Sequence, residues 1–183
     1  MALLTPQRIS LQTGETLLLR SAFREDAGMM LQHVHKVGSE TDFLTFGAGE
    51  FDKTEAEEAQ IVQNHLDADN QIFMLAFIEE ELVGMMNVHA RSRKRLRHVG
   101  EFGISVARAH WGKGIGQHMI LAMIAWAKAS GVIRKLNLMV NEENKRGIHI
   151  YKKLGFEVEG LLRRDFCLNG TFSDTYYMGM LID

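Results

Sequence analysis

The glycine-rich stretch from Trp111 to Gly116 (WGKGIG) is the part of the sequence with the clearest chemical potential. It lies between an apolar segment typical of a strand and an apolar segment typical of a helix. The first N–H groups of a helix have no partner within it, and the helix dipole adds positive potential there. Because glycines let an anion approach the backbone closely, the stretch predicts a site for a phosphate or pyrophosphate.

Two common phosphate-binding motifs do not fit this stretch. A P-loop requires Gly-Lys followed by Ser or Thr, whereas here Lys113 precedes Gly114. The dinucleotide fingerprint would require a third glycine where this chain has Gln117. On these residues alone, a tight strand-to-helix turn without a ligand stays an alternative.

Two charged stretches bear on the substrate. Arg91 to Arg97 (RSRKRLR) either contacts a polyanion such as RNA or forms a solvated hairpin tip. No aromatic residue is interleaved for base stacking, so a nucleic-acid partner is not expected. Glu50 to Glu58 (EFDKTEAEE) either attracts a cationic substrate or supplies carboxylates to the first turn of a helix, and we favour the helix.

Cysteine, histidine and hydropathy limit the class of protein. Cys167 is the only cysteine, so no internal disulfide can form, and the eight histidines have no metal-binding spacing. We therefore predict no metal and a reducing, cytoplasmic location. Met1 to Arg20 lacks the form of a secretory signal, and the longest apolar run, Met119 to Ala127, is too short to cross a bilayer, so no membrane partner is expected.

Length and periodicity predict one domain over residues 1–183. The elements form a mixed α/β layer fold around one central sheet. The predicted strands are Glu15–Ser21, Gln71–Glu79, Leu82–Ala90, Leu96–Val106, Lys135–Val140 and two strands after Phe156 joined at Asn169 and Gly170. The predicted helices are one capped by Asp26 and running to Val37, one with a capping box at Thr54 and Glu57 running to Leu66, one from the glycine-rich turn to Ser130, and Asn144–Leu154.

One predicted strand contains two glycines. Gly100 and Gly103 lie within Leu96–Val106, at positions where a strand bulges or lets another backbone or a ligand come close.

Taken together, the segment Ile104 to Gly116, then Asn144, then Tyr151 to Phe156 (YKKLGF) resembles the GNAT superfamily of acyl-CoA-dependent N-acetyltransferases. Gly114 and Gly116 match the two small residues of the family motif, while Trp111 stands where Gln or Arg is usual. The C-terminal part is most similar to the branch with ribosomal-protein N-terminal and spermidine acetyltransferases. The resemblance implies a mixed, mostly antiparallel sheet of about seven strands flanked by about four helices.

The resemblance also implies site residues and a cosubstrate, acetyl-CoA. Glu101 corresponds to the base that deprotonates the amine, and Tyr151 to the acid that protonates the departing thiolate. An amide near Val106 would stabilise the developing oxyanion. The residues implied to bind the cosubstrate are Ile104, Ser105, Val106, Trp111, Gly112, Lys113, Gly114, Ile115, Gly116, Asn144, Tyr151 and Lys153.

The expected activity is transfer of acetyl to a primary amine, either a protein N-terminus or a small molecule. The alternatives are a non-catalytic acyl-CoA-binding module and an RNA- or ribosome-associated module that uses Arg91 to Arg97. Acceptor identity, the length of the acyl chain and a homodimeric state stay open on the sequence.

Overall fold

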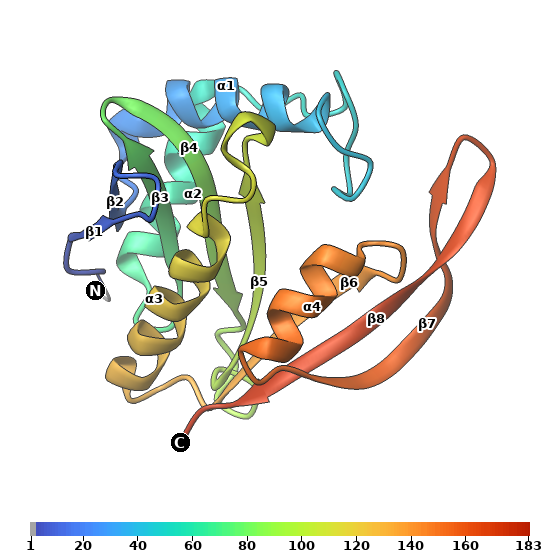
Figure 1. The fold of residues 1–183 in the computed structure, drawn as a ribbon. Helices are drawn as coiled ribbons and strands as arrows, with labels where there is room; N and C mark the ends of the chain where they lie inside the picture. Colours follow the sequence, from blue (N-terminus) through green and yellow to red (C-terminus); the bar gives the residue numbers. More distant parts are fainter. Residues whose placement is uncertain (1–2) are drawn as a thin grey trace.

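The computed structural model describes residues 3–183, which form eight strands and four α-helices (Figure 1). The strands are β1 (Gln7–Ser10), β2 (Thr16–Ser21), β3 (Ile72–Ile78), β4 (Glu81–Ala90), β5 (Val99–Val106), β6 (Lys135–Asn141), β7 (Glu157–Leu168) and β8 (Thr171–Leu181). The helices are α1 (Ala27–Gly38), α2 (Glu55–Asp67), α3 (Ile115–Ser130) and α4 (Lys145–Lys153), with short 3₁₀ turns η1 (Arg24–Asp26) and η2 (Arg108–His110).

One sheet contains all eight strands, in the order β1-β2-β3-β4-β5-β6-β8-β7. Every neighbouring pair is antiparallel except β5 and β6, which are parallel. The mixed, mostly antiparallel α/β fold is thus confirmed. The strand count is one higher than expected, because β1 pairs with β2 at the edge of the sheet.

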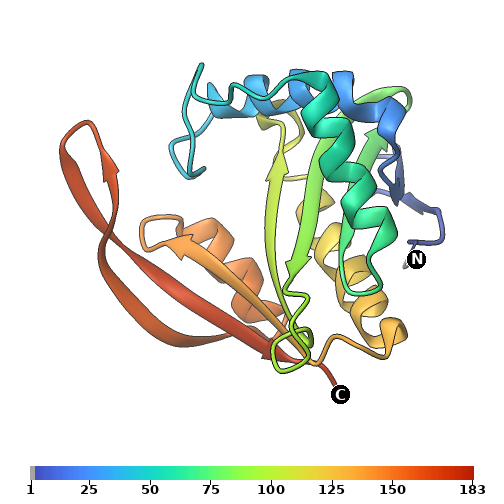
Figure 2. The ribbon, with the colours of Figure 1, turned by 180° about the vertical axis from the view of Figure 1, so that it is seen from behind.

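The helices cover the two faces of the sheet, as Figures 1 and 2 show from opposite sides. On one face, α3 and α4 pack on a core that includes Met86, Phe102 and Leu136. On the other face, α1 and α2 pack on a smaller core that includes Met85. Side chains alternate along a strand, so even-numbered residues of β5 face α3 and α4 and odd-numbered residues face the other side.

Local signals place the ends of several elements. Thr54 accepts a hydrogen bond from the Glu57 amide and Glu57 bonds back to Thr54, which is the predicted capping box of α2. Gly131 ends α3 in the left-handed region, with φ of 66°. Asp26 precedes α1, but its carboxylate is bonded to Arg20 and to the Phe23 amide and makes no cap to α1. The expectation that Asp26 caps this helix was therefore wrong.

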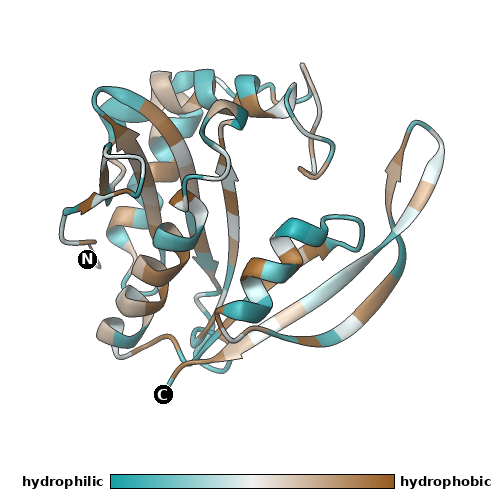
Figure 3. Ribbon diagram, in the orientation of Figure 1, coloured by the Kyte–Doolittle hydropathy of each residue, from teal (hydrophilic) through white to brown (hydrophobic). Residues whose placement is uncertain are grey.

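β7 and β8 form a long hairpin that projects from the body of the molecule (Figure 1). Its turn contains Asn169 and Gly170, both with positive φ, which confirms the predicted hairpin signal. Hydrophobic and hydrophilic residues follow one another along the hairpin (Figure 3). Several of its apolar residues are exposed, among them Leu161 and Phe172, and so is Cys167.

Candidate active site

The glycine-rich turn leads directly into α3. Gly112 and Gly114 have φ of 87° and 82°, a region that residues with a side chain rarely adopt. The first helical bond runs from the His118 amide to the Gly114 carbonyl, so the three preceding N–H groups of α3 have no acceptor within the helix. A Cβ atom on Gly112 would have no neighbour within 4 Å. The turn therefore presents accessible N–H groups at the positive end of a helix dipole.

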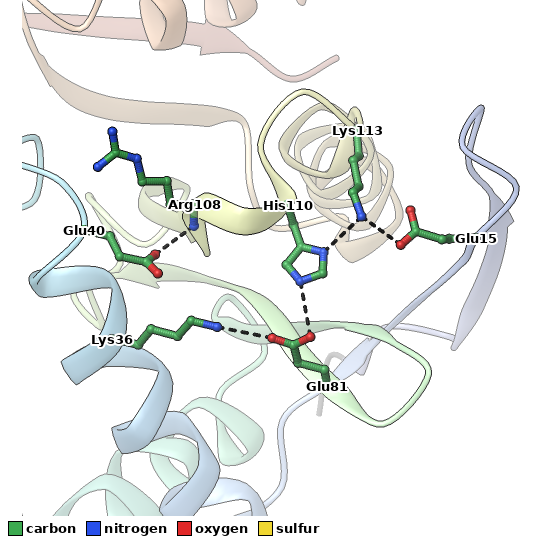
Figure 4. Close-up of polar contacts among 7 residues, drawn as sticks. All are labelled: Glu15, Lys36, Glu40, Glu81, Arg108, His110 and Lys113. Atoms are coloured by element: carbon green, nitrogen blue, oxygen red, sulfur yellow. Dashed lines mark hydrogen bonds and ion pairs between the residues drawn. The ribbon is translucent and has the colours of Figure 1, made fainter.

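A series of ion pairs and hydrogen bonds connects this turn to the residue before β2, to β4 and to α1 (Figure 4). Lys113 Nζ lies 2.7 Å from Glu15 Oε1 and 3.5 Å from His110 Nδ1. His110 Nε2 lies 3.3 Å from Glu81, which also accepts from Lys36 on α1 at 3.2 Å. The hydrogen bond from Lys113 lowers the pKa of Glu15. The Lys113 ammonium group is thus paired with Glu15 across the turn.

A second contact fixes the segment just before the turn. Glu40, in the loop after α1, accepts a hydrogen bond of 2.7 Å from the backbone amide of Arg108 (Figure 4). The path from β5 to α3 is thus held from the α1 side of the sheet.

On its β6 side, β5 has no strand partner beyond Glu101. The Ala107 amide bonds to the Val83 carbonyl on the β4 side, and the His98 carbonyl accepts from Arg134 and Lys135 on the β6 side. Since hydrogen-bonding direction alternates along a strand, the even-numbered residues Ile104 and Val106 direct their N–H and C=O groups toward β6. β6 pairs only with Val99, Gly100 and Glu101 before the two strands separate.

β6 therefore offers no partner to Ile104 or Val106, at the position where the resemblance implies an amide donor. β4 and β5 pair without any shift in register, so no bulge occurs at Gly100 or Gly103. Gly100 instead allows a close approach, since a Cβ there would lie 2.6 Å from Val88 Cγ1. The gap arises where the parallel strands β5 and β6 diverge (Figures 1 and 2).

Ser105 points to the opposite face from its neighbours Ile104 and Val106. Its hydroxyl lies 3.1 Å from Nε2 of His33, a buried histidine on α1. Burial lowers the pKa of His33 to about 4, so its imidazole is neutral at pH 7. The Ser105 side chain therefore belongs to the α1 side and not to the face with the glycine-rich turn. In the sequence, nothing distinguishes His33 beyond its place in a predicted helix.

Glu101 is exposed on the α1 side of β5, where the sheet begins to separate. Its neighbour on β6 is Asn137, which is buried and donates a hydrogen bond of 2.6 Å to the hydroxyl of Tyr177 on β8. Asn137 Oδ1 has no hydrogen-bond partner within residues 3–183. Glu101 is thus accessible from the face opposite the glycine-rich turn.

Tyr151 projects from α4 on the other face of the sheet. Its ring makes edge contacts with Phe102 of β5 and with Phe156, at centroid distances of 6.0 and 6.1 Å. Burial raises the pKa of Tyr151 to about 12, so its phenol is protonated at neutral pH. Glu101 and Tyr151 therefore lie on opposite faces of the sheet, on the two sides of the gap.

Two further predicted residues lie around the first turn of α3 and of α4. Asn144 accepts a hydrogen bond of 2.9 Å from the Gly147 amide and caps α4. Lys153, on α4, lies 3.4 Å from Gln117 Oε1 in the first turn of α3. Its charge is therefore close to the predicted phosphate position.

Trp111 stands between the glycine-rich turn and α4. Its indole Nε1 donates a hydrogen bond of 2.7 Å to the Val106 carbonyl. The guanidinium groups of Arg108 and Arg146 lie 5.8 and 5.5 Å from its ring centroid.

The basic turn between β4 and β5 is closed and ordered. The side-chain amide of Asn70 donates to the carbonyls of Arg91 and Arg97, and Arg97 pairs with Asp69. The other cations of the turn are exposed. This is the structure of a solvated hairpin tip.

Within residues 3–183, no group of three or more His, Cys, Asp or Glu side chains is arranged to hold a metal ion. Over the same residues, no helix is both long and apolar enough to span a bilayer.

Comparison with known proteins identifies the family. The sequence pattern of the acetyltransferase (GNAT) family matches residues 39–156. The chain belongs to the GNAT family. A solved GNAT acetyltransferase from Streptococcus pneumoniae is 35% identical, has a TM-score of 0.88, and the match covers 91% of this chain and 99% of that one. The predicted family and fold are confirmed, and the chain is an acetyl-CoA-dependent N-acetyltransferase.

Curated relatives of this GNAT enzyme act on different amines. Spermidine N(1)-acetyltransferase of Escherichia coli (strain K12) is 28% identical over 91% of this chain and 86% of its own length. The L-amino acid N-acetyltransferase AaaT of the same organism is 31% identical over 57% of this chain and 65% of its own length. A phosphinothricin acetyltransferase from Sinorhizobium meliloti, solved with acetyl-CoA, has the same fold, with 20% identity and a TM-score of 0.79 over 95% of this chain and 89% of that one.

The residues of this GNAT enzyme fit a coenzyme A thioester. The N–H groups at the start of α3 and the nearby Lys153 suit a pyrophosphate. The unpaired edge of β5 suits the amides of the pantetheine arm, because an extended chain of amides can pair with a free strand edge. The arm would then lead from the glycine-rich turn along Val106 and Ile104 toward the point where the sheet opens.

Proposed function

We propose that this enzyme acetylates the primary amine of a small molecule or a protein N-terminus by direct attack, with Glu101 as base and Tyr151 as acid. One observation carries the proposal: the free edge of β5 at Ile104 and Val106 separates an exposed carboxylate on one face from a protonated phenol on the other. Bound acetyl-CoA supplies the activated acyl group.

The acceptor side of the reaction needs a base. An alkylamine with a pKa near ~10.4 is almost wholly protonated at pH 7, and only the free base attacks a carbonyl. Glu101 is accessible from the α1 side of the sheet and takes this proton, directly or through water. As the new C–N bond forms, a backbone amide of β5 near Val106 that faces the gap provides a donor for the negative charge on the carbonyl oxygen.

The donor side of the reaction needs an acid. When the C–S bond breaks, the departing sulfur takes a proton, and the Tyr151 hydroxyl supplies it from the α4 side. Because burial raises the pKa of Tyr151 to about 12, the proton is present over the whole physiological pH range. The acid and the base therefore act from opposite sides of the sheet. Tyr151 does not obstruct the amine, and Glu101 does not obstruct the sulfur of coenzyme A.

Turnover measured with acetyl-CoA and three acceptors, spermidine, free amino acids and N-terminal peptides, tests this function. With the best acceptor, Glu101→Gln lowers kcat by about 100-fold or more at pH 7, because positioned proton transfer contributes roughly 10² to 10⁴ in rate. Glu25→Gln is a matched control, since Glu25 is an exposed carboxylate in η1 outside the site. Equal rates for the two variants would remove Glu101 from the mechanism.

A further inference from the structure

Trp111 lies between the end of β5 and α4, beside the edge of β5 that β6 leaves without a strand partner. It is 39% exposed, and its indole bridges from the Val106 carbonyl on β5 to the guanidinium of Arg146 in the first turn of α4. The Trp111 side chain thus contacts both β5 and α4, next to the place where β5 and β6 separate.

The Val106 carbonyl is the hydrogen-bond acceptor that the free edge of β5 offers closest to the glycine-rich turn. It faces away from β4, as the register with Val83 and Ala107 requires. An amide N–H of the pantetheine arm would have to reach this oxygen to continue the sheet along β5. The Trp111 indole N–H donates to this same oxygen, at 2.7 Å.

A carbonyl oxygen can accept two hydrogen bonds, but the indole ring also fills space beside it. The ring is held there by two cations, Arg108 and Arg146, in addition to its own N–H bond. The indole and the arm therefore compete for the same strand edge.

We propose that Trp111 sets the affinity of this enzyme for coenzyme A by covering the Val106 carbonyl, and that the indole leaves this carbonyl when the pantetheine arm binds. The inference rests on the proposed path of the coenzyme along β5. Trp111 controls binding and takes no part in proton transfer.

Titration calorimetry of coenzyme A against the wild type and Trp111→Phe tests the competition. Phenylalanine keeps an aromatic ring over the cations but has no N–H donor. Loss of a typical hydrogen bond that competes with the ligand tightens binding by about five-fold. The nucleotide half of coenzyme A, which has no pantetheine arm, is the matched ligand and binds both proteins equally. Thermal melting confirms that the variant is folded.

Fluorescence gives an independent readout. The chain has two tryptophans, Trp111 and the buried Trp126. Coenzyme A changes the emission of the wild type, because the Trp111 indole moves to a new environment, and it does not change the emission of Trp111→Phe.

Three results would overturn the inference: equal or weaker coenzyme A binding by Trp111→Phe, an equal gain for the nucleotide half, or wild-type emission that coenzyme A leaves unchanged. A wild type that binds no coenzyme A would contradict the proposed function itself, and the inference with it.

Discussion

Tyr151, the proposed acid, lies among aromatic rings. Phe102 and Phe156 enclose its ring, and the same enclosure raises its pKa to about 12. A phenol with this pKa keeps its proton at neutral pH. It can therefore donate a proton but cannot serve as a base.

Tyr151→Phe keeps the ring packing and removes the hydroxyl. We expect kcat to fall by about 100-fold while the affinity for coenzyme A changes little, because a proton donor acts only in the transition state. Steady-state rates and calorimetry with coenzyme A measure the two effects separately. An unchanged kcat would show that the sulfur is protonated by another group or by water.

His33, which is buried between α1 and the sheet, makes the stability of the folded protein depend on pH. Its folded-state pKa of about 4 lies below the ordinary value of 6.5, so between these values the unfolded chain binds a proton that the folded protein does not. Stability contributed by the neutral histidine is complete above pH 6.5 and is lost as the pH falls toward 4.

His33→Gln removes this loss and retains a polar partner for Ser105. Between pH 7 and pH 5 the wild type should lose about 2 kcal/mol more of its free energy of unfolding than the variant. Urea unfolding at the two pH values measures the difference. Parallel losses in both proteins would mean that His33 titrates normally.

At the scale of the elements, the contact between β4 and β5 depends on a missing side chain. A Cβ on Gly100 would lie 2.6 Å from Val88 Cγ1, and the stiff valine side chain has little room to move. A Cβ on Gly160, on β7, would have no neighbouring atom within 4 Å.

Gly100→Ala should therefore lower the free energy of unfolding by about 1 to 3 kcal/mol, the usual effect of overpacking. Gly160→Ala is the control and should stay within about 0.5 kcal/mol of the wild type. Denaturant titration compares the two. Equal stability of the two variants would show that β4 and β5 adjust without strain.

The elements that the sequence predicted have strong local signals. The capping box at Thr54 and Glu57, the left-handed Gly131 and the turn at Asn169 and Gly170 each depend on residues within a few positions of one another. Such signals need no knowledge of the rest of the chain, and the structure confirms the predicted capping box and hairpin turn.

What the sequence did not predict depends on distant partners. β1 is four residues long and is stabilised by pairing with β2, so its own pattern is too short to identify it. Asp26 was expected at a cap, but Arg20 attracts its carboxylate. The free edge at Ile104 depends on where β6 leaves β5, and no spacing within β5 encodes this. The sequence thus indicated the type of site but not which face each side chain occupies.

At the scale of the whole molecule, the sheet is two parts joined by a short parallel contact. β4 and β5 pair from Gly84 to Ala90 of β4, whereas β5 and β6 pair only from Val99 to Glu101 of β5. The two strands then diverge (Figure 2). A ligand that lies between β5 and β6 replaces the missing pairing and should hold the two parts together.

Coenzyme A should therefore stabilise the folded protein as a unit. At a ligand concentration of 100 times Kd, binding adds about 2.7 kcal/mol, which for a chain of this size raises Tm by about 5 to 10 °C. Thermal melting with increasing coenzyme A measures the shift. A Tm that does not respond would contradict binding in the gap.

The exposed position of Cys167 on the projecting hairpin has a practical consequence. The reaction liberates coenzyme A with a free sulfhydryl, and a chromogenic reagent that detects it will also modify this one accessible side chain. Each polypeptide then contributes a single stoichiometric equivalent before any acceptor is added. That initial step in absorbance counts the enzyme molecules in the cuvette, so product formed later can be expressed directly as turnovers per molecule.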